Sequence, residues 1–306
     1  MKFAFNMPHT MRLKALTQPW EFDVTGADQA VMARRAEELG YDMIAVPEHF
    51  VVPNTHVELS GPHYFHSTVA QAFVAGATQR IAVNSCVTLL PLQHPVVLAK
   101  ALSTADWMSS GRIMVSFGVG WDAEEFEILG VPFHERGRLA DEYLTAIIEL
   151  WTSESPSFEG KYVSFQNVAF EPKPVQKPHL PIWIGGDAKA ALRRAAKFAS
   201  GWLPFLTTPE DIPAGIEYIK SQPTFEGGPF EVCYGLGTSL VGEGHVIADD
   251  PTQRPGMKAE ELIDKLGTFS ELGVTMSSVP IPPVTDVNAY LDYAQWVIEA
   301  VKPNVP

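Results

Sequence analysis

The feature that most constrains this chain is a repeated alternation between short apolar segments and longer amphipathic segments along most of its 306 residues. Short apolar runs rich in β-branched residues predict buried strands, and apolar residues at helical spacing predict amphipathic helices. Strand character is found at residues 3–6, 42–46, 80–90, 113–119, 180–184, 202–205, 232–241 and 274–281. Helical patterns lie at residues 27–39, 68–78, 95–108, 135–151, 187–198, 259–272 and 287–301.

Continuous apolar strands separated by helices are typical of a parallel sheet that is buried on both faces. Two α/β folds fit this description, an open doubly wound sheet and a closed (β/α)8 TIM barrel. Eight strand candidates over 306 residues favour the barrel, and no Gly-x-Gly-x-x-Gly sequence follows the first strand. We therefore predict a TIM barrel and, because no long linker divides the chain, a single domain over residues 1–306.

One segment, residues 153–180, interrupts the alternation after the fourth unit. It holds five punctuating residues around the sequence Tyr-Val-Ser-Phe at 162–165, namely Pro156, Gly160, Pro172, Pro174 and Pro178. Prolines and glycines around a short β-prone run are typical of a hairpin. We predict that this segment is a hairpin inserted into the barrel.

Composition and charge exclude several classes of function. A hydrophobic content of 46% with 19% charged residues fits a globular chain with a large core. The two cysteines, Cys86 and Cys233, cannot form a disulfide framework, which predicts a reducing, cytoplasmic location. The first apolar run is too short for a signal peptide, and no run approaches the ~18 apolar residues of a membrane span. The net charge of −14 argues against nucleic-acid binding, although a helix amino end can still bind an anionic small molecule.

In a barrel the functional residues follow the carboxyl ends of the strands. Glu48 and His49 follow the second predicted strand, and a carboxylate beside a histidine could transfer protons near neutral pH. The alternative is that Glu48 pairs with a neighbouring loop and that His49 is a packed, hydrogen-bonded histidine. Both interpretations stay open.

The next two strands carry small residues where a ligand could approach the backbone. Cys86 and Val87 lie in the third strand, where small residues indicate either a bulge beneath a ligand or ordinary packing. Gly118 and Gly120 end the fourth strand before Trp121, and they leave room for a planar ligand or simply form a turn.

Gly185 and Gly186 end the fifth predicted strand directly before a helix, an arrangement that suits a phosphate site. Asp187 offers a competing explanation, because its carboxylate could cap the same helix. No metal site is predicted, since His63 and His66 have no carboxylate at ligand spacing and no Cys-x-x-Cys pair is present.

Together these segments resemble the luciferase-like monooxygenase superfamily, and within it the branch that uses the deazaflavin coenzyme F420. The resemblance rests on Val-Pro-Glu-His-Phe at 46–50, Leu-Leu-Pro-Leu-Gln-His-Pro-Val at 89–96 and Leu-Ala-Lys at 98–100. It continues through Thr-Ala-Asp at 104–106, Ser-Gly-Arg at 110–112 and Gly-Val-Gly-Trp at 118–121. Further matches are Glu-Glu-Phe at 124–126, Leu-Gly-Val at 129–131, Arg-Gly-Arg at 136–138 and Pro-Ile-Trp-Ile-Gly-Gly at 181–186. It covers residues 1–205 well and the last third in outline.

The resemblance implies where the coenzyme and the catalytic residues lie. Relatives commonly have Asp at the position of Glu48, and this residue with His49 lies at the reactive edge of the ring, so the pair is the predicted catalytic site. Relatives also carry a non-proline cis peptide behind the ring, which we place at Cys86–Val87. The coenzyme is then expected to contact Gly118, Gly120, Trp121 and Glu124 along its ring and ribityl chain, and Gly185 and Gly186 near its phosphate.

The implied activity is hydride transfer between F420 and a small alcohol, ketone or enone, with His49 exchanging a proton. If the coenzyme is FMN, the same pocket implies a monooxygenase with a flavin reductase partner. A third alternative is a barrel that binds a flavin without turnover. Residues 51–66 suit a lid over the pocket, and relatives often form homodimers.

Aromatic and basic residues are the candidates for the walls and the mouth of the pocket. Aromatic candidates, each with core packing as the alternative, are Trp20, Phe50, Phe65, Trp121 and Trp183. The acidic tail of F420 requires basic groups near the barrel mouth, for which the candidates are Lys100, Arg136, Arg138 and Lys189.

Overall fold

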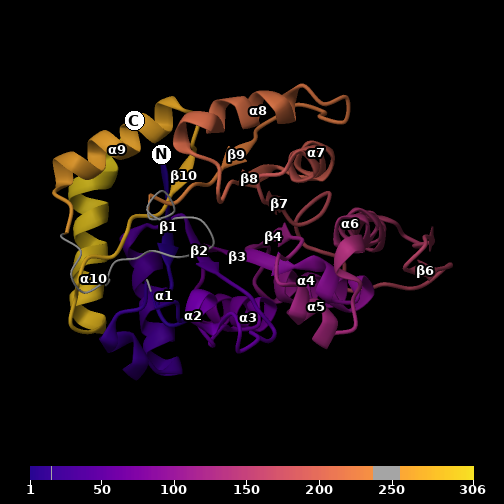
Figure 1. The fold of residues 1–306 in the computed structure, drawn as a ribbon, viewed down its shortest axis with the longest axis horizontal. Helices are drawn as coiled ribbons and strands as arrows, with labels where there is room; N and C mark the ends of the chain where they lie inside the picture. Colours follow the sequence, from indigo (N-terminus) through magenta and orange to yellow (C-terminus); the bar gives the residue numbers. More distant parts are fainter. Residues whose placement is uncertain (15, 237–255) are drawn as a thin grey trace.

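The strands form one parallel ring in a computed structural model that describes residues 1–14, 16–236 and 256–306. Their order is β10-β1-β2-β3-β4-β7-β8-β9, so the strands follow one another around the ring in chain order, and the last, β10, pairs with the first, β1. Figure 1 views the ring of strands down the axis of the barrel, with the helices outside it. The bounds are β1 (Lys2–Asn6), β2 (Met43–Val46), β3 (Ala82–Leu89), β4 (Ile113–Gly118), β7 (Ile182–Gly185), β8 (Gly201–Leu203), β9 (Glu231–Val232) and β10 (Met276–Ser277).

Backbone hydrogen bonds between the segments of β9 and β10 close the ring. The amide of Thr275 donates to the carbonyl of Val232 (2.9 Å), and the amide of Tyr234 donates to the carbonyl of Met276 (3.0 Å). Full closure removes the exposed sheet edges that an open sheet would have. The predicted (β/α)8 barrel is therefore confirmed.

One long helix follows each strand of the ring. These helices are α1 (Gly26–Leu39), α3 (Ser67–Ala77), α4 (Pro95–Met108), α6 (Arg136–Thr152), α7 (Lys189–Phe198), α8 (Ile212–Lys220), α9 (Ala259–Glu271) and α10 (Val287–Trp296). Shorter helical turns are η1 (Pro19–Asp23), α2 (Val57–Ser60), η2 (Leu90–Leu92), α5 (Ala123–Ile128), η3 (Phe133–Glu135), η4 (Pro209–Asp211), η8 (Val297–Val301) and η9 (Lys302–Asn304). In the described part of the chain, no helix is long and apolar enough to cross a membrane.

The core has two layers, because each strand presents alternate residues to the helices and to the barrel interior. The larger cluster lies between strands and helices, and the smaller one fills the barrel with Ala4, Met43, Trp183 and Met276. Local sequence sets the helix ends: Thr25 and Asp28 form a capping box at α1, and Gly40 ends that helix at φ +88°.

Helix α8 was not predicted, because its sequence contains Pro213 and Gly215. Proline is tolerated in the first turn of a helix, where its missing N–H would have no partner. A side chain at Gly215 would meet the Trp202 ring at 2.4 Å, so glycine lets α8 pack on β8. Of the predicted strand 232–241, residues 237–241 lie outside the described residues.

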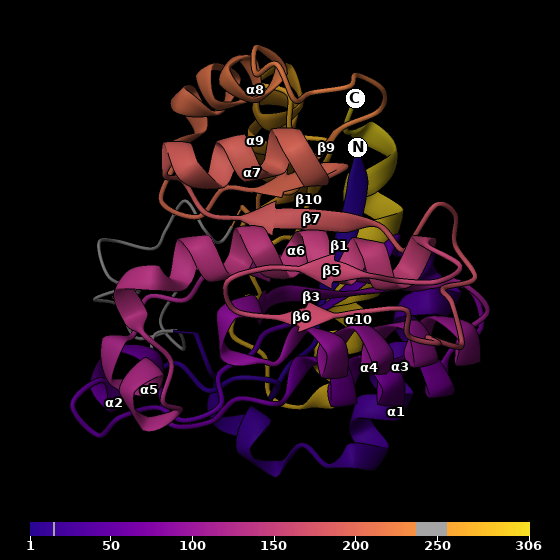
Figure 2. The same ribbon diagram turned by 90° about the vertical axis from the view of Figure 1, so that its right-hand side faces the viewer.

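The insertion after the fourth unit is a hairpin of β5 (Phe158–Glu159) and β6 (Ser164–Phe165), as predicted. Figure 2 shows it lying across the outside of α6. Buried Asp106 of α4 accepts hydrogen bonds from the Val175 amide (2.8 Å) and the Gln176 side chain (2.7 Å). These contacts fix the insertion to the outside of the barrel.

Candidate active site

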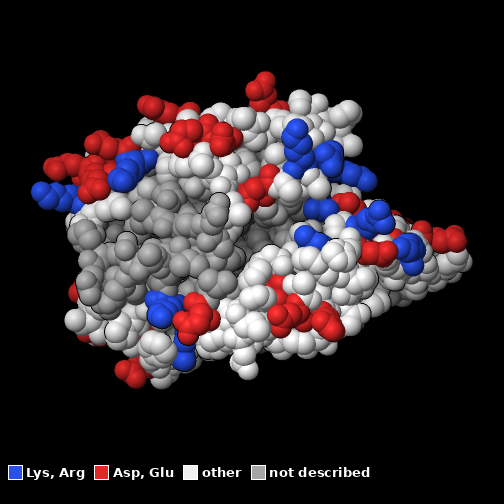
Figure 3. All heavy atoms as spheres, in the orientation of Figure 1, with Lys and Arg blue, Asp and Glu red and all other residues white. Residues whose placement is uncertain are grey.

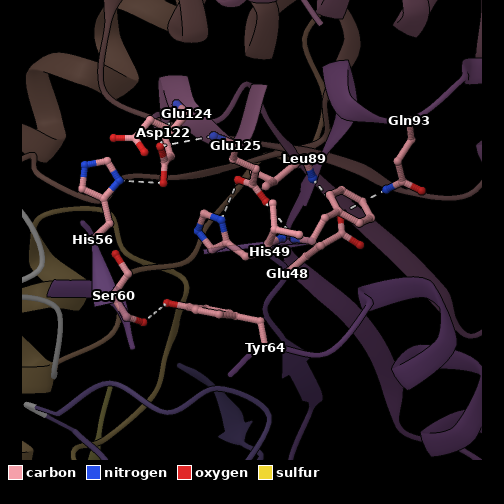
Figure 4. Close-up of polar contacts among 12 residues, drawn as sticks. Glu48, His49, His56, Ser60, Tyr64, Leu89, Gln93, Asp122, Glu124 and Glu125 are labelled. Carbon is pink, nitrogen blue, oxygen red and sulfur yellow. Dashed lines mark hydrogen bonds and ion pairs between the residues drawn. The ribbon is translucent and has the colours of Figure 1, made fainter. Parts of the chain in front are cut away.

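A histidine–carboxylate pair lies at the carboxyl ends of β2 and β4. The Nδ1 atom of His49, just past β2, is 2.8 Å from Oε2 of Glu125 in α5 (Figure 4). The side chain of His49 is 11% exposed, whereas that of Glu125 is 1% exposed. A buried carboxylate that holds Nδ1 leaves Nε2 as the ring nitrogen available to a ligand.

Glu125 is a candidate site residue that the sequence did not predict. Its Oε1 atom accepts hydrogen bonds from the amides of Phe50 (2.7 Å) and Val51 (3.3 Å), so one carboxylate holds both the ring of His49 and the backbone beyond it. The Glu-Glu-Phe sequence at 124–126 is part of the resemblance, but the resemblance predicts Glu124, and not Glu125, as the site residue. Nothing in the sequence of this six-residue helix distinguishes buried Glu125 from its neighbour Glu124.

Glu48 lies beside His49 in sequence but faces away from it. Its carboxylate is buried and accepts hydrogen bonds from the Ser67 amide and hydroxyl, the Leu89 amide and the Gln93 side chain, at 2.8 to 3.0 Å. His66 Nδ1 lies 3.3 Å from the same group. With both oxygens engaged, Glu48 joins the starts of α3 and α4 to the ends of β2 and β3. A catalytic role for Glu48 stays a prediction that these contacts do not favour.

Residues 51–66, called the strap below, cross from β2 to α3 and are fixed on two sides. On one side Thr55 donates to Glu124 (3.0 Å), and Nδ1 of His56 lies 2.8 Å from Asp122 (Figure 4). On the other side, a β-bridge joins Tyr64 to the loop after β1. The lid predicted for this segment stays a prediction, but its contacts place it against the helix that carries Glu125.

Tyr64 of the strap packs edge-on against His49, with ring centroids 4.7 Å apart. Burial and the nearby charge of Glu125 raise the pKa of the Tyr64 phenol well above its usual range. The phenol therefore keeps its proton near neutral pH, and it donates to the carbonyl of Ser60 (2.7 Å). Tyr64 thus packs against the ring of His49 while its hydroxyl is engaged by the Ser60 carbonyl.

The peptide bond between Cys86 and Val87 is cis, as the resemblance implied. The strand pairing between β3 and β4 shifts register at this point. Val87 then packs between two predicted site glycines: a Cβ at Gly118 would lie 2.5 Å from its Cγ2 atom, and one at Gly185 would lie 2.7 Å from its Cγ1 atom. The structure thus brings Val87, Gly118 and Gly185 together, and both glycines make room for Val87. Burial raises the pKa of the Cys86 thiol to about 12, which makes it unreactive.

At the other two predicted site glycines, Gly120 and Gly186, the backbone has positive φ. Gly120 has φ +76°, and a Cβ there would meet the Phe126 ring at 2.7 Å. Gly186 has φ +118°. Asp187 does not cap α7; it accepts hydrogen bonds from the amides of residues 205, 206 and 207. The amino end of α7 therefore has no side-chain cap, which removes the competing explanation for a phosphate site there.

The aromatic candidates for the pocket differ in their exposure and in their contacts. Trp121 is 38% exposed and lies between two imidazoles, 6.0 Å from the ring of His49 and 5.4 Å from that of His56. Trp20 is buried against Tyr290, and Trp183 fills the barrel interior, so both are core residues. Phe50 contacts the ring of His66, and Phe65 that of His63.

Of the four basic candidates, two are engaged by other groups of the chain and two are exposed. Lys100 is held over Phe170 by the insertion, and Arg136 donates to the carbonyl of Gly120 (3.2 Å). Arg138 and Lys189 are exposed. Figure 3 shows Lys and Arg side chains gathered over α7 and beside α6. Among the residues that the structure describes, no group of three or more His, Cys, Asp or Glu could hold a metal ion.

These features define a class of protein: a TIM barrel with a histidine–carboxylate pair at the carboxyl ends of its strands. Residues 1–275 match the model of the luciferase-like monooxygenase family. The chain belongs to this family. The match reaches well beyond residue 205, where the resemblance in sequence became weaker.

Two relatives in sequence and one protein of similar fold were found. The chain is 30% identical over 285 residues to an uncharacterized protein of Mycobacterium tuberculosis, covering 87% of this chain and 92% of that one. It is 27% identical over 236 residues to the FMNH2-dependent dimethylsulfone monooxygenase of Pseudomonas putida, covering 74% and 62%. The coenzyme F420-dependent tetrahydromethanopterin reductase of Methanopyrus kandleri has the same fold, with a TM-score of 0.73, 17% identity and coverage of 100% and 99%.

Proposed function

We propose that this chain is an oxidoreductase that transfers a hydride between coenzyme F420 and a small organic substrate, an alcohol, ketone or enone. The observation that carries the proposal is the pair of His49 and Glu125 at the barrel mouth. The carboxylate of Glu125 accepts a hydrogen bond from Nδ1–H of His49, so neutral His49 presents an unprotonated Nε2 atom. That atom can take the proton of a substrate hydroxyl, and the imidazolium can return it to a carbonyl oxygen.

The residues around the mouth fit a flavin-type coenzyme. The β3 bulge at Val87, with Gly118 and Gly185, would support the ring next to His49. The uncapped amino end of α7 would hold a phosphate, since free backbone N–H groups bind anions. When bound, the deazaflavin supplies a carbon centre that gives or accepts a hydride, while His49 handles the proton.

The preference for F420 over FMN rests on charge. The chain has a net charge of −14, yet Arg138 is exposed in the first turn of α6, and Lys189 and Arg193 are exposed in the first half of α7. These cations would balance the acidic tail that distinguishes F420 from FMN. Two free cysteines further support the cytoplasmic location in which such a coenzyme would be met.

Equilibrium titration of the purified chain with F420 and with FMN, followed by fluorescence, tests the proposal. We expect saturable binding of F420, weakened several-fold by Arg138→Glu and by added salt, because both reduce attraction for the tail. Binding of FMN alone would identify a monooxygenase that needs a flavin reductase partner, the activity suggested by the dimethylsulfone monooxygenase. Binding of neither coenzyme would contradict the proposal.

A variant of His49 separates catalysis from coenzyme binding. We expect His49→Ala to bind F420 with unchanged affinity and to lose turnover by about 10²–10⁴-fold, the usual contribution of a general acid–base group. The exposed His134→Ala is the control and should leave both unchanged. Equal turnover of His49→Ala and the wild type would instead support a barrel that binds a flavin without using this histidine.

We also propose that two copies of the chain form a homodimer through the outer faces of α3 and α4. Exposed apolar side chains gather there on adjacent helices: Val69, Phe73, Val97, Trp107 and Met108. A patch of this kind on a surface rich in acidic residues is typical of a protein interface.

A further inference from the structure

The strap contacts every acidic side chain in the first turn of α5. Glu124 accepts from the hydroxyl of Thr55 (3.0 Å), and Asp122 lies 2.8 Å from Nδ1 of His56. Glu125 accepts from the amide of Val51, the first residue of the strap, and from that of Phe50 directly before it. The short helix that carries the partner of His49 is therefore held from outside, along its whole first turn.

Asp122 links the two histidines through its two oxygens. Oδ2 faces His56, while Oδ1 accepts hydrogen bonds from the backbone amides of Glu124 (3.0 Å) and Glu125 (3.4 Å). The Asp122 side chain is 1% exposed, whereas that of His56 is 28% exposed. A continuous path of hydrogen bonds thus runs from His56 through Asp122 to the backbone of Glu125, and from the Glu125 side chain to His49 (Figure 4).

A six-residue helix has few internal hydrogen bonds, so its position depends on its caps and its neighbours. His56 is the side chain of the strap that engages the capping residue itself. Without its hydrogen bond, one oxygen of buried Asp122 would lack its imidazole partner. The first turn of α5, with Glu125, would then be free to shift relative to His49.

We propose that His56 is a positioning residue, which holds Asp122 and α5 where Glu125 fixes the proton of His49 on Nδ1. Docking of the strap on α5 then completes the acid–base pair, so that His49 has its catalytic tautomer only beneath a docked strap. A lid that assembles the reacting groups on closing couples substrate enclosure to catalysis. The catalytic part of this inference rests on the proposed function, but the positioning of the His49 ring does not.

The test follows the ring nitrogens of His49 by ¹H–¹⁵N correlation NMR of the chain labelled at histidine, without coenzyme. His49→Gln identifies the signal. In the wild type we expect Nδ1 to carry the proton. In His56→Leu we expect a large share of the Nε2–H form, because the neutral tautomer follows the hydrogen bond that is available. His56→Asn, whose amide can still donate to Asp122, should restore the wild-type pattern.

Lys14→Met is the matched control, because it removes a partner of the strap at the exposed ion pair with Glu58, whose side chains are 81% and 84% exposed. It should leave the tautomer of His49 unchanged. A wild-type tautomer in His56→Leu would overturn the proposal. So would an equal loss in His56→Leu and His56→Asn, since the hydrogen bond to Asp122 would then not be the cause.

Turnover gives an independent measurement. With F420 and an accepted substrate, His56→Leu should lower kcat about tenfold, less than the loss of His49 itself, and His56→Asn should recover most of it. If the tautomer shifts as expected but no coenzyme supports turnover, the proposed function fails and the positioning role of His56 stands. If turnover is found and the tautomer does not move, the reverse holds.

Discussion

At the scale of single residues, the site is organised by buried carboxylates, each with several donors. Glu48 illustrates the principle: four hydrogen bonds, from Ser67, Leu89 and Gln93, reach its two oxygens. A buried charge is costly unless its hydrogen-bonding capacity is filled, so this carboxylate is stable only with all of these partners in place. Through these contacts Glu48, which follows β2, connects the start of α3 with the end of β3 and the loop before α4; this set of contacts is called the Glu48 joint below.

Glu48→Gln tests whether this joint is structural. The amide would turn a donor toward the Leu89 amide or the Ser67 amide, leaving a buried N–H without an acceptor. We expect the free energy of unfolding to fall by about 2–3 kcal/mol in urea denaturation. Glu58→Gln, at an exposed ion pair, should cost less than about 1 kcal/mol. A Glu48→Gln variant that is fully stable but inactive would restore the predicted catalytic role of Glu48.

The sequence predicted one half of the histidine–carboxylate pair. His49 was found because strand ends in a barrel are known positions for function, and the resemblance pointed to the same residue. Its partner Glu125 lies 76 residues away in the chain. Which of Glu124 and Glu125 turns inward depends on how a six-residue helix is rotated, and so short a helix has no periodicity to reveal it.

At the scale of elements, the junction of β3, β4 and β7 determines the shape of the proposed coenzyme platform. Val87 fills the space that side chains at Gly118 and Gly185 would occupy. The sequence indicated that these glycines leave space, but not what fills it. A pattern of small residues indicates only that another group packs closely against the backbone. Which group this is, here the Val87 side chain, depends on the tertiary structure.

Substitution at this junction should show coupling. Gly118→Ala places a methyl group 2.5 Å from Val87, and we expect a loss of about 1–3 kcal/mol in the free energy of unfolding. Val87→Ala in the same chain should recover part of this loss, with a coupling energy of about 1–2 kcal/mol. Gly26→Ala, where the structure shows open space, is the control and should be nearly neutral. Strict additivity of Gly118→Ala and Val87→Ala would contradict the packing described here.

Most elements of the barrel were predicted within a few residues. The prediction for 27–39 became α1 (Gly26–Leu39), and that for 113–119 became β4 (Ile113–Gly118). In both elements the apolar residues recur at regular spacing, and glycine marks the end, at Gly40 after α1 and at Gly118 in β4. Helix α8 was missed because its tolerance of Pro213 and Gly215 depends on position and on the Trp202 ring, which local sequence does not report.

At the scale of the whole molecule, charge is distributed unevenly. Each copy carries a net charge of −14, so two copies repel one another over most orientations. α3 contains no ionisable residue, and the two in α4 are occupied: Asp106 is buried and Lys100 is held by the insertion. The outer faces of α3 and α4 therefore form an apolar surface on which two copies can meet without bringing like charges together.

Phe73→Glu tests this interface, because it places a new negative charge in the middle of the apolar surface of α3. We expect light scattering after size exclusion to give about twice the chain mass of 33.6 kDa for the wild type and the single-chain mass for the variant. The reason is that a buried like-charge pair costs several kcal/mol at an interface. Leu206→Glu changes a residue of similar exposure that follows β8, and it should leave the wild type's mass unchanged. A dimeric Phe73→Glu variant would exclude α3 from the interface, while a monomeric wild type would remove the proposed dimer altogether. Ser67, the first residue of α3, donates to Glu48. The free energy of unfolding of the dissociated variant should therefore also show whether dimer formation stabilises the contacts of Glu48.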